Sequence, residues 1–136
     1  MLVLVVALAI AVGFHILNTR KMNAVYQATG GAIRNRHDLE MVRGAVNLSM
    51  RLAVIYIIIF VILLIYVVIR FISGSPGQGI LTLFLFGIIT LPIGLFGKRY
   101  EKRIKRMRLE SDDPGLEEKY QDYLKQWDRP QFQLKD

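Results

Sequence analysis

The chain of 136 residues contains no cysteine, which excludes disulfides, thiolate metal ligands and cysteine nucleophiles. It also has no Asp or Glu inside its long apolar runs, where a proton or cation carrier usually needs one, so an independent transporter is not expected. It has no phosphate-binding loop, nucleophile elbow or prenylation motif. The sequence therefore predicts no enzyme and no cofactor.

Three apolar runs, separated by strongly charged segments, dominate what is present. The central one, Leu52–Ile69, has 18 residues without a charge between Arg51 and Arg70. As a helix it would be about 27 Å long, close to the hydrocarbon thickness of a bilayer. We therefore predict an all-α membrane protein whose three transmembrane helices cover about residues 2–18, 52–71 and 80–97.

The charges predict how these spans are oriented. Residues 18–51 carry six Lys or Arg against two acids, and residues 98–110 carry seven against two. Both basic segments are expected on the cytoplasmic side, which places the N-terminus outside and the C-terminus inside. We accordingly predict a multi-pass protein of a bacterial inner membrane. Nucleic acid is not expected as a partner, because both basic segments directly flank apolar spans.

Residues 19–51 are polar but periodically patterned, and they allow two arrangements. In the first, they form a cytoplasmic helical hairpin that turns at Gly30-Gly31, since paired glycines break helices. The returning helix would bury a stripe with helical spacing and continue into the central span. In the second, the segment lies flat on the lipid headgroups. The stripe consists of Leu39, Val42, Val46 and Met50.

Beyond residue 110 the sign of the charge reverses, with seven acids against four bases in residues 111–136. We therefore divide the chain into a membrane domain with helical extensions, residues 1–110, and an acidic C-terminal helix and tail, residues 111–136. Asp113 as N-cap and Pro114 at the first position predict a helix over about 114–127. Its apolar stripe must be buried, either on this chain or on a partner. The stripe comprises Leu116, Tyr120, Tyr123, Leu124 and Trp127.

Small residues in the first and third apolar runs predict close helix packing. In the third run, Gly87, Thr90, Gly94 and Gly97 share one arc of a helical wheel. In the first run, Ala7 and Ala11 share one face, and Gly13 lies nearly opposite. The alternative for all of them is that alanine and glycine are simply frequent in membrane helices.

The basic segment after the third run is expected to bind anionic lipid headgroups. Its cations are Lys98, Arg99, Lys102, Arg103, Lys105, Arg106 and Arg108. His15 lies within the first span, near its inner end; a proton-relay or metal role competes there with anchoring at the interface. We expect His37, Asp38 and Glu40 to form a solvated helix face, because their spacing does not suit a metal.

Three functional hypotheses remain open. The leading one is a non-catalytic subunit, structural, regulatory or for assembly, of a larger membrane protein complex. It would dock through small-residue helix faces and cytoplasmic amphipathic helices. The alternatives are a homo-oligomeric, holin-like pore and a lipid-sensing membrane adaptor that recruits a soluble protein. The expected partners are accordingly larger membrane subunits, anionic lipid or further copies of the same chain.

Overall fold

A computed structural model describes residues 1–129 and 131–135 of the chain. It is 81% helical and has four helices, as the sequence predicts. Two short strands join the ends of the long helices. The elements are α1 (Leu2–Thr29), β1 (Ala32–Ile33), α2 (Arg36–Ile72), α3 (Pro76–Lys105), β2 (Arg108–Leu109) and α4 (Pro114–Trp127).

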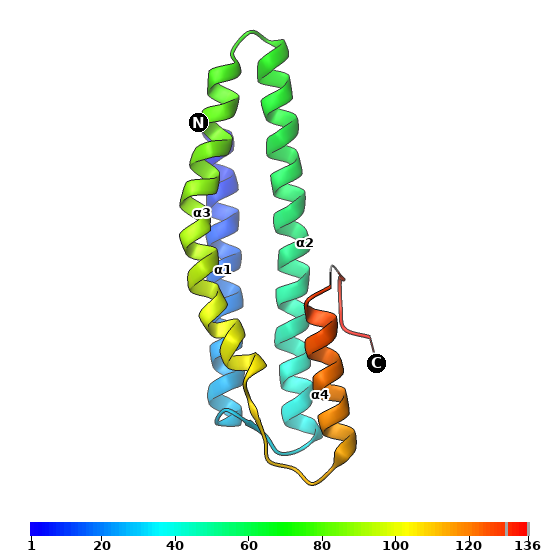
Figure 1. Ribbon diagram of the computed structural model, residues 1–136. Coiled ribbons are helices and arrows are strands. Elements are labelled where there is room, and N and C mark those ends of the chain that lie inside the picture. Colours follow the sequence, from blue (N-terminus) through cyan, green and yellow to red (C-terminus); the bar gives the residue numbers. More distant parts are fainter. Residues whose placement is uncertain (130, 136) are drawn as a thin grey trace.

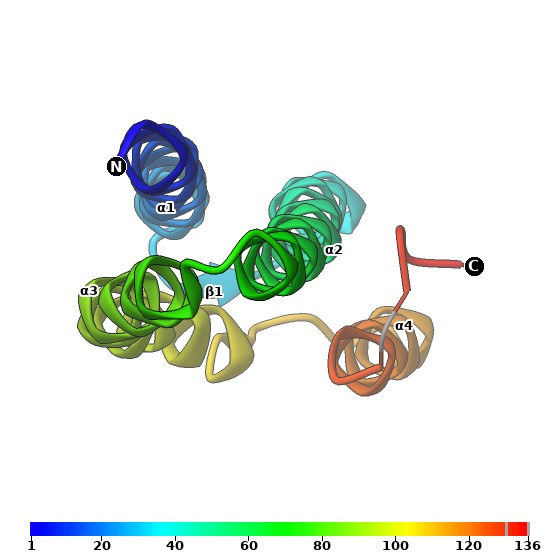
Figure 2. The same cartoon turned by 90° about the horizontal axis from the view of Figure 1, so that it is seen from above.

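The three long helices form an elongated bundle, and α4 lies beside α2 at one end of it (Figures 1 and 2). We call the end that carries α4 the polar end. With 28, 37 and 30 residues, α1, α2 and α3 are each long and apolar enough to cross a membrane. By composition the chain is a multi-pass membrane protein. The depth and orientation of its insertion stay predictions.

The connection between α1 and α2 depends on two glycines in the left-handed region of the backbone. Gly30 caps α1 with φ 63°, and Gly31 follows with φ 75°. A Cβ on Gly31 would also lie 3.0 Å from the Tyr26 hydroxyl oxygen, so a side chain there would need the Tyr26 ring to move and would be strained by the positive φ. The chain therefore reverses within a few residues, and α2 begins at Arg36.

A two-residue parallel bridge fixes this turn to the end of α3, a feature that the sequence analysis did not predict. Ala32 pairs with Arg108 and Ile33 pairs with Leu109. The amide of Arg108 donates to the Gly31 carbonyl at 3.1 Å. The bridge thus ties together two loops that are far apart in the sequence.

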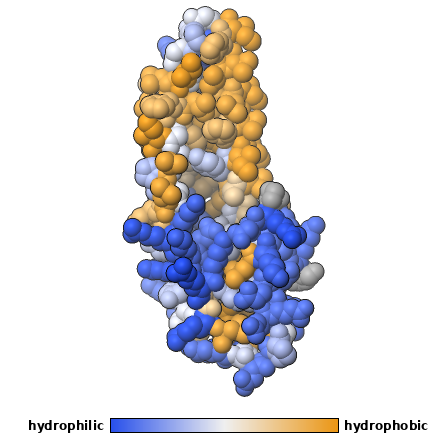
Figure 3. Space-filling model, in the orientation of Figure 1, coloured by the Kyte–Doolittle hydropathy of each residue, from blue (hydrophilic) through white to orange (hydrophobic). Residues whose placement is uncertain are grey.

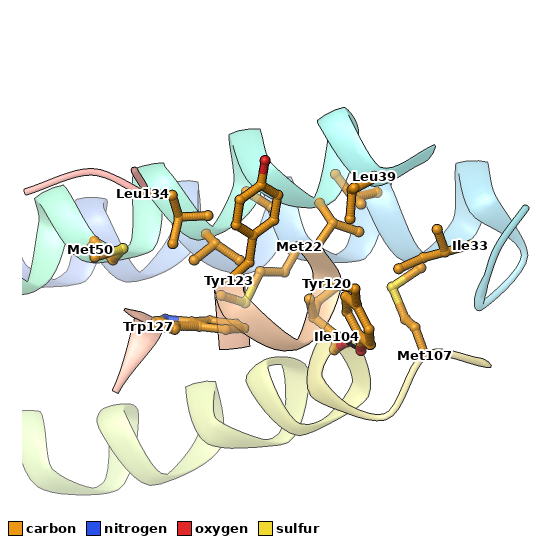
Figure 4. Close-up of a cluster of buried hydrophobic side chains, with 14 of the residues drawn as sticks. Met22, Ile33, Leu39, Met50, Ile104, Met107, Tyr120, Tyr123, Trp127 and Leu134 are labelled. Carbon is orange, nitrogen blue, oxygen red and sulfur yellow. Dashed lines mark hydrogen bonds between the residues drawn. The ribbon is translucent and has the colours of Figure 1, made fainter. Parts of the chain in front are cut away.

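The largest hydrophobic cluster, which we call the polar-end core, lies outside the apolar windows of the three long helices (Figure 4). It joins side chains from all four helices, β1, the segment that follows α3 and the C-terminal tail. Every residue of the predicted stripe on α2 is buried in it. The members are Met22, Val25, Ile33, Leu39, Val42, Ala45, Val46, Met50, Ile104, Met107, Leu116, Tyr120, Tyr123, Trp127 and Leu134.

Helix α3 begins earlier than the third transmembrane helix predicted from the sequence, which covered about residues 80–97. The connecting loop is shorter, because Pro76 occupies the first turn of α3, where its missing N–H costs no hydrogen bond. Gly79 is thereby inside the helix, and a Cβ there would lie 3.0 Å from the Val67 Cα. This is a close approach of α2 and α3 that needs glycine.

Helix α4 begins as predicted: Asp113 is its N-cap, and the Asp113 carboxylate accepts from the Gly115 amide at 2.9 Å. Within the described residues 131–135, the tail that was predicted to be acidic also packs against the bundle. Leu134 is buried, and its amide donates to the Asn47 Oδ1 at 2.6 Å. The C-terminal segment is therefore folded onto α2.

Two titratable side chains fasten α4 to α3. The Lys105 Nζ lies 2.8 Å from the Asp128 Oδ1 and 2.9 Å from the Glu101 Oε1, and it also sits over the Trp127 ring. Burial lowers the pKa of Lys105, but these two hydrogen bonds and charges outweigh it and raise the pKa above 10.5. Burial also raises the pKa of Tyr120 to about 12, and its hydroxyl donates to the Ile104 carbonyl at 2.6 Å.

Removing the Trp127 side chain should release α4 from the rest of the chain. Loss of a large core side chain costs about 3–5 kcal/mol, which is on the order of a hundredfold or more in the opening equilibrium. For Trp127→Ala we expect amide exchange over residues 114–127 to accelerate by that factor, measured by mass spectrometry. Lys119→Ala, at an exposed position on the same helix, should leave exchange unchanged.

Alkaline pH should also release α4, and the single tryptophan reports it. Both the Lys105 and the Tyr120 pKa are raised by folding, so the stability that they contribute is complete below about pH 10 and is lost as pH rises through their folded values. We expect a red shift of Trp127 fluorescence above pH 10. In Tyr120→Phe the transition should move to higher pH, and an unchanged midpoint would contradict the role of Tyr120.

Candidate functional site

A cavity of about 400 Å³ lies between α1, α2 and α3 and is the best candidate for a functional site. Its volume is within the range of about 300–1,000 Å³ that is usual for small-molecule pockets. Each long helix supplies both apolar and polar side chains. The lining residues are Ala11, Phe14, His15, Asn18, Ser49, Leu52, Ala53, Tyr56, Thr90, Leu91, Ile93, Gly94, Leu95, Gly97, Lys98 and Glu101.

The cavity is polar at one end and largely apolar toward the other. Along α1 the lining changes from Ala11 and Phe14 to Asn18, and along α3 from Leu91 to Lys98. Because α3 runs in the same direction as α1, the polar side chains of both helices gather at the polar end (Figure 1). Figure 3 shows the outer surface changing from apolar to hydrophilic along the same axis. The cavity therefore spans an apolar–polar boundary.

One hydrogen-bonded pair crosses the cavity wall from α2 to α3. The Thr90 hydroxyl donates to the Phe86 carbonyl at 2.7 Å, and the Tyr56 and Thr90 oxygens lie 2.9 Å apart. Since the single Thr90 proton is used on the backbone, Tyr56 is the donor of the second bond. Thr90 thus bonds a carbonyl of its own helix and links α3 to Tyr56 of α2.

The ring of His15 lies against α3 at the polar end of the cavity. A Cβ added to Gly97 would lie 3.1 Å from the His15 Cε1, so glycine allows this approach. The ring is also 6.4 Å from that of Phe96, centroid to centroid. Next along α1, the Asn18 Oδ1 is buried with no hydrogen-bond partner among the described residues. These contacts place His15 in the packing between α1 and α3.

The structure separates the predicted small residues into two groups. Ala7, Ala11 and Thr90 are buried inside the bundle, and Gly97 contacts His15. In contrast, a Cβ on Gly13, Gly87 or Gly94 would meet nothing within 4 Å. The first group packs this chain's own helices, and the second leaves open space beside them.

The aromatic stripe of α4 lies in this chain's own polar-end core. Leu116, Tyr120, Tyr123 and Trp127 are buried there, and Tyr123 is only 1% exposed. Leu124 is partly buried against the same cluster. The sequence left open whether this stripe is buried on a partner or on the chain itself; in the structure it is buried on the chain itself.

The predicted lipid-binding cations lie on the last turns of α3 and the segment after it, at the polar end, and Lys105 is the least exposed of them. Lys98, Arg99, Lys102, Arg103, Arg106 and Arg108 are exposed. Arg103 stacks over Tyr26 and Tyr100, and Arg108 pairs with Glu110. Lys105 instead contacts Glu101 and Asp128, as described above, so it belongs to the attachment of α4.

The sequence analysis did not identify Asn18, Ser49, Tyr56 or Glu101 as members of a site. Tyr56 was a usable signal, because a polar group within an apolar span is costly unless it has a partner or a function. The other three lie at the ends of spans, where polar residues are common. Only the packing of three helices shows that they line one cavity.

Among the described residues, no group of three or more His, Cys, Asp or Glu is placed to hold a metal ion. Comparisons with family models, with curated proteins and with solved structures found no match. The functional evidence is therefore the geometry of this chain's own residues.

Replacing Gly97 should weaken the bundle, because the space beside it is filled by His15. Overpacking of this kind costs about 1–3 kcal/mol. We expect Gly97→Leu to lower the thermal stability of the detergent-solubilised protein, measured by Trp127 fluorescence and circular dichroism. Gly87→Leu, on the same helix but beside open space, should melt within a degree or two of the unmodified protein. Equal melting of both variants with the unmodified chain would contradict the contact.

Proposed function

We propose that this chain is a non-catalytic subunit of a larger membrane protein complex and binds its partners through the apolar faces of its spans. The observation that carries the proposal is how little of those faces the chain itself covers. In the most apolar 18-residue window of α2, only 6% is buried inside the protein. The part of α2 at the polar end packs in the polar-end core, so that part stabilises the fold, and the apolar part is available to bind a partner.

The open glycines support helix-to-helix contact as the mode of binding. Gly13 on α1 and Gly87 on α3 have no neighbouring atoms where a side chain would begin. Small residues let backbones of membrane helices approach closely, and van der Waals packing then drives association where water is absent. A partner helix seated on either glycine would use space that this chain leaves empty.

The proposed orientation places the polar end in the cytoplasm and the N-terminus outside. The exposed cations of α3 and the loop that follows it gather there, in agreement with the tendency of Lys and Arg to remain on the cytoplasmic side. Since α4 is already buried on α2, partner contacts in this proposal lie within the membrane rather than on the α4 stripe.

The proposal is tested by purifying the tagged chain from its native membrane in mild detergent and identifying what accompanies it. We expect at least one larger membrane protein, which Gly87→Leu should displace without loss of the α4 fold. Gly77→Leu is the matched control, because its neighbourhood is also open but it lies at the outer end of α3.

Other results would favour the two alternative functions or remove the proposal. Copies of this chain alone would support a homo-oligomeric pore, and a soluble protein alone would support a lipid-sensing adaptor. A monomer with no companion, or a companion that Gly87→Leu and Gly77→Leu retain equally, would contradict binding through the open face of α3.

A further inference from the structure

We infer that the cavity between α1, α2 and α3 binds one phospholipid, with an acyl chain against its apolar walls and an anionic, hydroxyl-bearing head group at its polar end. This inference rests on the membrane placement that the proposed function assumes, but it does not need a protein partner. It differs from the general attraction of lipid head groups to surface cations because it assigns one lipid to a defined cleft between the three helices.

The shape of the site comes from small side chains on facing helices. Ala53 of α2 and Gly94 of α3 both line the cavity, and no atom lies within 4 Å of where a Gly94 Cβ would be. A second hollow of about 230 Å³ adjoins it at Ser49, Ala53 and Glu101 and extends to Trp127. The two hollows share these three lining residues of α2 and α3, so they lie next to each other.

The chemistry changes along the cavity as it does along a phospholipid. Its apolar walls include Phe14, Leu52 and Leu91, which suit hydrocarbon and offer no hydrogen bonds. Its polar end includes Asn18, Lys98 and Glu101, and the Glu101 carboxylate is paired with Lys105 at 2.9 Å. An amphiphile with its head group at the polar end would match both the apolar walls and the polar end, whereas a fully polar solute would leave the apolar walls uncovered.

The polar end favours a phosphate together with head-group hydroxyls. The Lys98 ammonium can pair with a phosphodiester oxygen in a charge-assisted contact. The Asn18 Oδ1 is buried without a partner, so it needs a donor, and a head-group hydroxyl supplies one. The exposed cations around this level favour a lipid with net negative charge over a neutral one. Phosphatidylglycerol combines these features.

The test is native mass spectrometry of the purified full-length chain, titrated in detergent with phosphatidylglycerol, phosphatidylethanolamine or phosphatidylcholine. We expect one retained phosphatidylglycerol, with the two neutral lipids bound at least about tenfold more weakly. Ala53→Trp and Gly94→Leu, which fill the cavity from facing helices, should both lose it. Amide exchange of α4 shows whether each variant is folded. If one variant is unfolded, the other still tests whether lipid binding needs the cavity.

Two lysine variants separate binding in the cavity from general attraction of anionic lipid to surface cations. Lys98→Gln changes a residue that lines the cavity. Lys102→Gln is its matched control, because Lys102 is in the same exposed basic segment but does not line the cavity. Loss of one charged hydrogen bond should weaken binding about tenfold for Lys98→Gln, and Lys102→Gln should stay within twofold. The inference would be overturned by any of three results. These are lipid retained by both cavity-filling variants, equal effects of the two lysine variants, and no lipid retained on the unmodified chain. Equal binding of a neutral lipid would overturn the head-group assignment.

Discussion

Hydrophobic burial at the polar end is the interaction on which the rest of the structure depends. In the proposed membrane placement this end lies in water, so removing apolar side chains from water supplies a driving force there that packing within lipid does not. The polar-end core joins all four helices, whereas the cluster within the spans consists of Leu4, Ala7, Ala11, Leu63 and Phe86. The fold is therefore held mainly from one end.

This arrangement explains why the cavity occurs where it does. Above the polar-end core, the facing positions are occupied by small residues such as Ala11, Ala53 and Gly94, which do not fill the space between three helices. One hydrogen bond and one close packing contact join the helices around it: the Tyr56–Thr90 hydrogen bond and the approach of the His15 ring to Gly97. The polar-end core therefore bounds one end of the cavity, and these two contacts lie in its wall.

The parts of the fold that could be predicted from sequence are those encoded locally. Long apolar runs identify three helices, Gly30-Gly31 identifies a turn, and Asp113 with Pro114 identifies the start of α4. Pairing between β1 and β2 could not be predicted, because two residues carry no periodic signal. The cavity could not be predicted either, since its residues come from three helices whose relative rotation depends on the whole core. Sequence could show that the α4 stripe needs burial, but not what buries it.

The central claim, that α4 packs into its own chain, is tested most directly by NMR of the full-length protein in lipid nanodiscs. Tyr120 and Ile104 lie together in the polar-end core (Figure 4), with a hydrogen bond of 2.6 Å from the Tyr120 hydroxyl to the Ile104 carbonyl. We predict an NOE between the Tyr120 ring and an Ile104 methyl group when both labels are on one chain. An NOE seen only when the two labels are on different chains would contradict the account.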